Sequence, residues 1–249
     1  MQFSSSLCRG QLIRRYKRFL ADVIHQDSSP EAPLTIHCPN TGKMTGCAEP
    51  GWTVYFSTSD NQKRKYAHTW ELVENQRGDF ICVNTARANL LVGEALEQKR
   101  IPQLAQYGDI RAEVRYGNEG SRIDFLLSGG VEPVCYVEVK SVTLLDESEG
   151  EMTGQGYFPD TESLRAQKHV RELIDCVNNG HRAVLLFCVL HTGIERVSPA
   201  SHLDSAYGAL VAEALAAGVE CLAWRADISP GGMQLVQALP FDMHVNNGA

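Results

Sequence analysis

The chain has 249 residues, of which 43% are hydrophobic and 21% are charged, a composition typical of a globular protein. It contains no apolar run near the roughly 18 residues that suggest a membrane-spanning helix. Its first ten residues lack the charged start and apolar middle of a signal peptide. We therefore expect a cytoplasmic protein without a membrane partner. Its eight cysteines form no C-x-x-C pair and do not favour a disulfide framework or a zinc site.

The net charge of −7 is divided unevenly along the chain. Residues 1–80 contain 10 Lys/Arg and 8 Asp/Glu, a balance of +2, whereas residues 81–249 contain 13 and 22, a balance of −9. The positive charge is concentrated in the runs Arg14–Arg18 and Lys63–Lys65. Because phosphate responds to the local potential, the first part of the chain is suited to nucleic acid although the whole chain is acidic.

Up to about residue 80 the pattern is one of short strands. Runs rich in β-branched and aromatic residues are separated by Pro, Gly, Asn and Asp, which are turn formers. The predicted strands are Leu12–Asp22, Leu34–Cys38, Thr53–Ser59 and Tyr66–Val73. So many short strands in a small span predict a small β-barrel of the oligonucleotide-binding (OB) type as the first domain, residues 1–80.

From residue 84 onwards helical and strand patterns alternate. The predicted order is helix Thr85–Gln98, strands Ile110–Tyr116, Arg122–Leu127 and Val134–Val142, helix Ser163–Val177, strand His181–Leu190, helix Asp204–Ala217 and strand Val219–Arg225. The run His181–Leu190 is apolar on both faces, as in a strand covered on both sides. We therefore predict a second domain, residues 81–249, with a mixed sheet flanked by helices, and an α+β or α/β fold class overall.

Three ionisable residues are predicted to meet in one hairpin of this domain. Gly129 and Gly130 lie between two strand-like runs and favour an antiparallel hairpin. If the turn is centred near Val131, Asp124 lies opposite Glu138, and directly opposed Cβ atoms are about 5 Å apart. Side chains alternate with period two along a strand, so Lys140 shares the face of Glu138.

Two facing carboxylates repel each other and favour a bound hard cation such as Mg²⁺ or Mn²⁺. Such an ion lowers the pKa of bound water and stabilises the charge that develops on a phosphodiester. A neighbouring lysine can orient the water or neutralise the phosphate. Glu94, on the preceding helix, is a candidate third carboxylate. The alternative is a structural ion pair of Lys140 with Asp124 or Glu138, since buried charges are normally paired.

The helix–strand–strand–strand–helix–strand order, with Asp124 followed by Glu138-Val139-Lys140, resembles the PD-(D/E)XK nuclease superfamily. The resemblance implies that Asp124, Glu138 and the Val139 carbonyl bind Mg²⁺ and that Lys140 is catalytic. Its further implications concern the two helices: Glu94 as the acidic residue of the first, and Gln167 and Lys168 as substrate contacts on the second. His169 is a candidate neighbour of the site.

Further segments extend the resemblance over nearly the whole chain. They are Arg14–Val23, His37–Gly42, Val83–Thr85, Ser121–Asp124, Val137–Leu144, Phe158–Asp160 and Gln167–His169. These segments resemble the sugar fermentation stimulation protein A family. The resemblance implies a bacterial DNA-binding protein, described as a regulator of sugar (maltose) metabolism, with an OB-like barrel before a nuclease-like domain. A long acidic loop, Asp146–Met152, departs from the family pattern.

The basic run Arg14–Arg18, with Tyr16 among its cations, suits phosphate contact and base stacking. The alternative is a solvated strand edge that is protected by charge. The candidate DNA-binding residues are Arg14, Arg15, Tyr16, Lys17, Arg18, His37, Asn40, Lys43, Lys63, Arg64, Lys65, Gln167 and Lys168.

These observations predict a DNA-binding protein without strong sequence preference. Its second domain is predicted to be a metal-dependent phosphodiesterase, an endonuclease or exonuclease, with Asp124, Glu138 and Lys140 as catalytic residues. The competing hypothesis is a binding-only transcriptional regulator with a vestigial nuclease site. No motif supports an enzyme that acts on sugars or other small molecules, and a homo-oligomer is compatible with the sequence.

Overall fold

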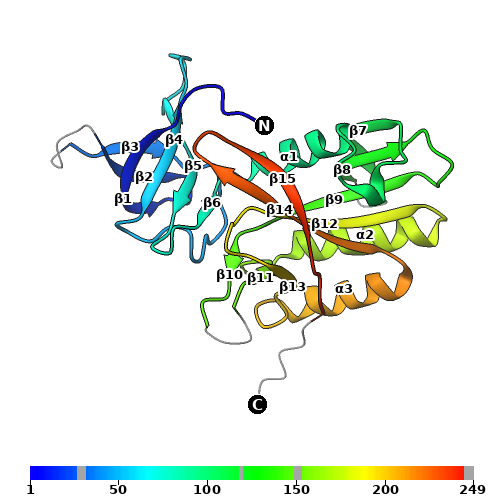
Figure 1. The fold of residues 1–249 in the computed structure, drawn as a ribbon. Coiled ribbons are helices and arrows are strands. Elements are labelled where there is room, and N and C mark those ends of the chain that lie inside the picture. The colour runs from blue at the N-terminus through cyan, green and yellow to red at the C-terminus, as the bar shows by residue number, and fades with distance from the viewer. Residues whose placement is uncertain (27–31, 118–119, 149–152, 244–249) are drawn as a thin grey trace.

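The computed structural model describes residues 1–26, 32–117, 120–148 and 153–243, which form two domains in contact (Figure 1). Residues 149–152, the second half of the predicted acidic loop, lie outside the described residues. Within the described ranges, no helix is long and apolar enough to cross a membrane.

The first domain is a closed β-barrel. Its strands are β1 (Cys8–Tyr16), β2 (Leu20–His25), β3 (Leu34–His37), β4 (Thr53–Thr58), β5 (His68–Glu74) and β6 (Phe80–Cys82). They pair in the order β3-β2-β1-β4-β5-β6, and the barrel closes where β3 pairs with β5 at His37 and Thr69. Buried apolar side chains fill it, among them Leu12, Ile36, Phe56 and Trp70. The predicted small barrel is confirmed.

The single strand predicted over Leu12–Asp22 is wrong. Lys17 and Arg18 have φ angles of 50° and 64° and form a tight turn between β1 and β2. Hairpin turns of this kind usually carry Asn or Gly, because other residues rarely adopt positive φ. Two basic residues at these positions therefore give no turn signal.

The second domain contains a six-stranded mixed sheet in the order β15-β14-β12-β9-β8-β7. Its elements in chain order are α1 (Ala86–Glu97), the 3₁₀ helix η1 (Pro102–Leu104), β7 (Asp109–Tyr116), β8 (Ser121–Ser128), β9 (Cys135–Val142), α2 (Leu164–Asn178), β12 (Arg182–Val189), α3 (Ser205–Ala217), β14 (Glu220–Ser229) and β15 (Gly232–Leu239). A smaller sheet contains β10 (Leu144–Leu145), β11 (Gln155–Phe158) and β13 (Arg196–Pro199). The mixed sheet is confirmed, whereas the sequence patterns predict neither β15 nor the small sheet.

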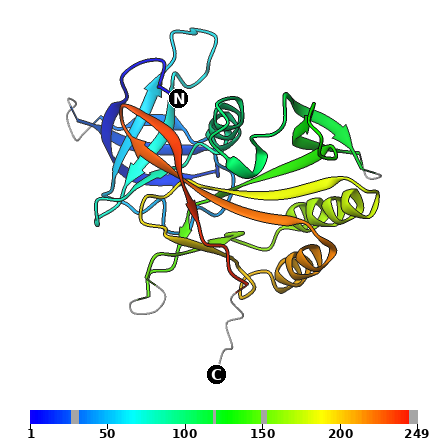
Figure 2. The same ribbon diagram turned by 45° about the vertical axis from the view of Figure 1, so that its right-hand side comes forward.

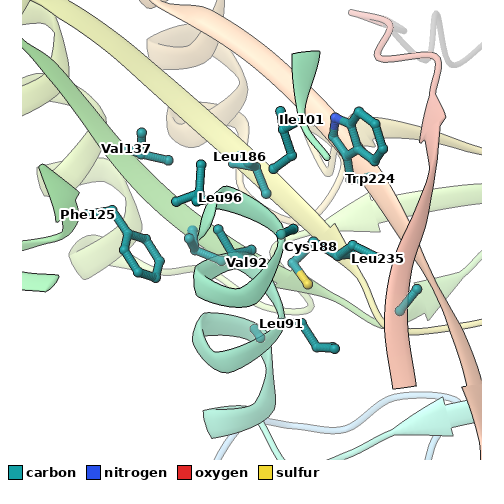
Figure 3. Close-up of a cluster of buried hydrophobic side chains, with 14 of the residues drawn as sticks. Leu91, Val92, Leu96, Ile101, Phe125, Val137, Leu186, Cys188, Trp224 and Leu235 are labelled. Carbon is teal, nitrogen blue, oxygen red and sulfur yellow. The ribbon is translucent and has the colours of Figure 1, made fainter. Parts of the chain in front are cut away.

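Helices cover both faces of the large sheet, with α1 on one face and α2 and α3 on the other (Figures 1 and 2). Strand β12 alternates between the two apolar cores, with Leu186 in the core under α1 and Leu185 in the core under α2 and α3. Figure 3 shows Val92 and Leu96 of α1 near Leu186 and Val137 of the sheet. The predicted burial of this strand on both faces is confirmed.

Strand β6 connects the barrel to the second domain. The backbone N–H of Cys82 donates to the Leu190 carbonyl at 2.9 Å, and that of Thr192 donates to the Phe80 carbonyl at 3.0 Å. Leu72 of the barrel also belongs to the core under α1. The predicted division after residue 80 thus falls inside β6, which continues to Cys82.

One buried carboxylate joins the starts of α2 and α3. Asp204 caps α3 by accepting from the Tyr207 N–H at 2.9 Å. It also accepts from the Ser163 N–H at 2.9 Å and from Gln167 Nε2 at 2.9 and 3.1 Å. Ser163 in turn caps α2, accepting from the Ala166 N–H.

We predict that Asp204→Ala lowers the free energy of unfolding by about 2 kcal/mol at neutral pH, because the helix cap is lost and buried donors lose their acceptor. Burial raises the pKa of Asp204, but hydrogen bonds from Ser163, Tyr207 and Gln167 outweigh it and hold the pKa below 3.8. The stabilisation is therefore present above pH 3.8 and is lost as the pH falls through the lower folded pKa. Urea unfolding at several pH values measures the difference.

The matched control is the exposed Glu162→Ala, which should change the free energy of unfolding by no more than about 0.5 kcal/mol. A difference between wild type and Asp204→Ala that stays constant down to the lowest pH would contradict this account.

Candidate metal centre and nucleic-acid surface

The register of the β8–β9 hairpin decides which side chains meet. The β8–β9 pairing runs from Leu127 opposite Cys135 to Phe125 opposite Val137 and ends there, and the same register continued by one residue sets Asp124 against Glu138. At that position the Asp124 Oδ2 atom accepts from the Val139 N–H at 2.7 Å. The carboxylate of Asp124 is therefore inserted beside β9 at the end of the paired segment.

Two donors orient the Asp124 carboxylate. Besides the Val139 N–H, Asn89 of α1 donates to the Oδ1 atom at 2.7 Å. Burial, followed by the negative charge of Glu138, raises the pKa of Asp124, and the two hydrogen bonds only partly oppose this. A carboxylate in this position is stabilised by a nearby cation.

Glu138 is 3% exposed and carries two contacts on one oxygen. Lys140 Nζ donates to Oε1 at 2.8 Å, and His169 Nδ1 of α2 also hydrogen-bonds to Oε1. Burial raises the pKa of Glu138, but the His169 hydrogen bond and the Lys140 charge outweigh it, so the pKa is lowered overall. The Oε2 atom is buried and has no hydrogen-bond partner in the described part of the chain.

Lys140 lies on the same face of β9 as Glu138, while Val137 and Val139 belong to the core under α1, as the alternation predicts. Its Nζ is 3.4 Å from His169 Nδ1 and 6.0 Å from the centre of the Phe158 ring. The ion pair expected by the structural alternative therefore exists with Glu138.

Glu94 is engaged elsewhere. Its carboxylate is 2.5 Å from the amino group of Met1 and 3.6 Å from Arg100. Asn89 and Glu94 are five positions apart on α1, which turns them about 140° from each other. The geometry gives no support to Glu94 as a metal ligand. Asn89 is the α1 side chain that contacts Asp124, and neither its type nor its spacing distinguishes it in the sequence.

The residues predicted on α2 have different surroundings. Gln167 is buried and donates to Asp204, so it holds α2 to α3. Lys168 is half-buried next to it. His169, expected as a neighbour of the site, does contact Glu138.

The oxygen atoms at this site suit a hard cation. Among the described residues, no three His, Cys, Asp or Glu side chains are grouped so as to hold a metal ion. Two carboxylates, those of Asp124 and Glu138, remain as side-chain donors, with the Val139 carbonyl as the predicted third. Mg²⁺ is commonly bound by one or two carboxylates and keeps several waters, so the unpartnered Oε2 of Glu138 beside Asp124 fits such an ion.

The β1–β2 turn presents part of the basic run. Lys17 and Arg18 are exposed, and the next residue, Phe19, is 44% exposed. The Arg14 side chain is 68% exposed, pairs with Asp22, and lies 5.0 Å from the centre of the Tyr16 ring. These cations and rings are available to a phosphate backbone and its bases.

Arg15 has a structural role. Its Nη2 atom donates to the carbonyls of Arg18, Asn40 and Gly42, each at 2.8 Å, and so holds the loop after β3. Lys43 in this loop is exposed.

The same loop contacts the second domain. Its Met44 N–H donates to Asp160 at 3.1 Å. A cavity of about 150 Å³ lies between the loop and the second domain, lined in part by Asn40, Ser141 and Phe158.

The second basic run lies beside the closure of the barrel. Arg64 donates to Thr69 at 2.9 Å, and Thr69 is paired with His37. Burial and the positive charge of Arg64 lower the pKa of His37. Lys63 and Lys65 are exposed. The structure thus brings His37 and Lys63–Lys65 together, although they are distant in sequence.

Two family models match the chain: the SfsA N-terminal OB domain over residues 13–83, and the sugar fermentation stimulation protein RE domain over residues 86–232. A sugar fermentation stimulation protein homolog from Hahella chejuensis is 56% identical over 237 residues, which cover 94% of this chain and 95% of that protein. The solved structure of Pyrococcus furiosus SfsA in complex with Ca²⁺ is 26% identical, with a TM-score of 0.83 and coverage of 97% and 98%. The chain belongs to the sugar fermentation stimulation protein A (SfsA) family.

Proposed function

We propose that the protein binds DNA without strong sequence preference and hydrolyses phosphodiester bonds at Asp124, Glu138 and Lys140 with Mg²⁺ or Mn²⁺. The observation that carries the proposal is the cluster at the end of the β8–β9 pairing. The half-buried carboxylate of Asp124 and the buried carboxylate of Glu138 lie next to the last paired residues, Phe125 and Val137, and the buried Lys140 is bonded to Glu138. The related Pyrococcus protein was solved with Ca²⁺, a cation that takes oxygen ligands, and this supports a hard cation here.

Asp124, Glu138 and the Val139 carbonyl would hold the cation. Once bound, it would supply Lewis-acid polarisation of the phosphate and a lowered pKa of the attacking water. Asn89 and the Val139 N–H keep the Asp124 carboxylate in one orientation. These contacts pre-organise the site, because the carboxylate has few other orientations open to it.

Lys140 is suited to position the reacting groups. An ammonium has three donors, and the contact with Glu138 Oε1 uses one of them. The others can donate to a phosphate oxygen or to the attacking water. His169 shares the contact with Glu138 and thereby limits where the Lys140 head group lies.

A continuous set of contacts leads from the barrel to this site. Arg15 holds the loop after β3, and Met44 of that loop donates to Asp160, two residues after Phe158. The Phe158 ring in turn lies against Lys140. We infer that DNA held by Lys17, Arg18 and the Lys63–Lys65 run crosses this loop to reach the carboxylates. The barrel supplies the affinity, since the second part of the chain is acidic.

A specific observation favours the competing function, a binding-only regulator with a vestigial site. Lys140 and His169 already contact the Glu138 carboxylate, and Glu94 does not join it. The family name connects these proteins to sugar fermentation, and a role in regulating sugar (maltose) metabolism would need DNA binding alone.

We expect the wild-type chain to cut end-labelled single- or double-stranded DNA with Mg²⁺ or Mn²⁺ and not with EDTA. Asp124→Asn and Lys140→Ala should each lower the cleavage rate by about 100-fold or more, because each removes a group that acts on the transition state. Gel analysis of the products measures the rate, and retained DNA binding shows that the variants are folded.

The matched control is Glu97→Gln, which neutralises an exposed acid on α1 and should leave cleavage unchanged. Wild-type protein that binds DNA and never cuts it with either metal would refute the nuclease and leave the binding-only regulator.

For DNA binding, we expect Lys17→Ala/Arg18→Ala to weaken binding of all sequences equally. The plot of log K against log salt has a negative slope, and its magnitude should decrease by about 2, because each lost phosphate contact removes about 0.9. Fluorescence anisotropy at several salt concentrations measures the slope. Lys99→Ala/Arg111→Ala removes the same charge from exposed positions of the second domain and serves as the control. An equal change of slope in both variants would contradict a barrel-based surface.

A further inference from the structure

A groove lies along α2. It has a volume of about 520 Å³ and is lined by Tyr116 of β7, Tyr136 of β9, Glu172 and Asp175 of α2, and His181. Helix α2 lies along this face of the sheet in both views (Figures 1 and 2). The function proposed above assigns no role to these residues.

Several of the residues that line the groove belong to the same two elements as the site residues, β9 and α2. Tyr136 precedes Glu138 by two positions on β9 and shares its face, while Glu172 follows His169 by three positions on α2 and shares its side of the helix. Tyr116 and Glu172 line the same groove, and the Glu172 carboxylate lies against Gly117, the residue after Tyr116.

Three buried polar atoms in this groove have no hydrogen-bond partner among the described residues. They are the two carboxylate oxygens of Glu172, a residue that is 2% exposed, and the hydroxyl of Tyr116. Buried polar atoms are nearly always hydrogen-bonded, and an unpaired buried carboxylate is especially costly. A ligand that supplies donors to Glu172 and an acceptor to Tyr116 would satisfy all three atoms.

The pattern of these atoms matches one nucleobase. A carboxylate offers two adjacent acceptors, and the Tyr116 hydroxyl can donate. The Watson–Crick edge of guanine carries two adjacent donors, N1–H and the N2 amino group, beside the O6 acceptor. Adenine and cytosine present a donor beside a ring-nitrogen acceptor, and thymine presents one donor between two acceptors. The natural DNA base that offers Glu172 two donors side by side is therefore guanine.

Aromatic rings provide the stacking surface that a base requires. The centres of the Tyr116 and Tyr136 rings are 5.6 Å apart, and those of Tyr136 and His181 are 5.3 Å apart. Stacking on such rings contributes to the binding of unpaired bases whatever their identity. Identity is then determined by the hydrogen bonds at the edge of the base.

We propose that this groove binds an unpaired guanine of the DNA strand, with Glu172 accepting from N1–H and the N2 amino group and Tyr116 donating to O6. The role in cleavage rests on the function proposed above: the guanine would lie beside the phosphate that is cut. Because the Watson–Crick edge is free only in an unpaired base, the substrate is single-stranded or locally opened DNA.

The test measures binding of fluorescein-labelled thymidine pentamers that carry one central guanine, adenine or cytosine, by anisotropy in EDTA so that no strand is cut. Wild-type protein should bind the guanine pentamer about tenfold more tightly than the other two, as expected for a bidentate contact. In Glu172→Gln one acceptor becomes a donor, so the preference should shift to adenine or cytosine. Tyr116→Phe should weaken binding of the guanine pentamer alone.

Asp175→Asn is the matched control, because it removes the same charge from an exposed position of the same groove and should keep the guanine preference. Equal affinity of the wild type for the three pentamers would overturn the proposal, as would an equal loss for all three in Glu172→Gln. Mn²⁺ binding that depends on Glu172, without a base preference, would assign the groove to a cation and also overturn it.

Free deoxynucleoside monophosphates separate this proposal from the nuclease. Saturation-transfer NMR should detect dGMP on the wild type more strongly than dAMP, dCMP or dTMP, and this signal requires neither a DNA strand nor cleavage. A guanine preference without DNA cutting would refute the nuclease and support the guanine site in the groove. DNA cutting without a base preference would support the nuclease and overturn the guanine site.

Discussion

The pairing of β8 with β9 determines which ionisable side chains are buried together. Phe125 opposite Val137 places Val137 and Val139 in the core under α1, and places Glu138 and Lys140 on the face covered by α2. A shift of one residue would exchange these two sets, moving charges into the apolar core and valines to the site. The apolar packing of α1 and the charged cluster under α2 are thus two consequences of one register.

The charged cluster contains ion pairs, but not every carboxylate oxygen in it has a partner among the described residues. Lys140 and His169 share one oxygen of Glu138, and the other oxygen has no partner in the described chain. Asp124 is held by neutral donors and is a half-buried carboxylate whose pKa is raised. One additional positive charge between these carboxylates would give the free oxygen of Glu138 a partner and would stabilise the ionised form of Asp124. This is the physical argument for a cation. The same kind of argument applies to Glu172 in the groove along α2.

Much of this arrangement could be predicted from the sequence, because it depends on local patterns. Gly129 and Gly130 mark the hairpin turn, and period-two alternation then places Glu138 and Lys140 on one face of β9, while Asp124 bonds to Val139 at the end of the paired segment. The β1–β2 turn could not be predicted, since Lys17 and Arg18 adopt positive φ without glycine or asparagine.

Contacts between distant segments were also beyond prediction. The amino group of Met1 pairs with Glu94, and Asp204 binds Gln167, so two polar residues expected at the site are used elsewhere. Sequence patterns give the side of a helix that is apolar. They do not tell which polar side chain on the other sides finds a tertiary partner. The contact of Asn89 with Asp124 could therefore not be predicted.

The basic residues of the barrel have two roles, which depend on whether each side chain finds a tertiary partner. Arg15 is directed inward by three carbonyl oxygens and holds the loop that contacts the second domain, whereas Lys17 and Arg18 remain exposed. A run of cations in the sequence is therefore both part of the framework and a candidate surface for phosphate.

The most direct test is calorimetric titration of Mn²⁺ into the metal-free protein, comparing wild type, Asp124→Asn, Glu138→Gln and the control Glu97→Gln. The account predicts one site in wild type and control, and its loss in both Asp124→Asn and Glu138→Gln. Wild-type protein that binds no Mn²⁺, or binding that is unchanged in both variants, would contradict the assignment of Asp124 and Glu138 as cation ligands.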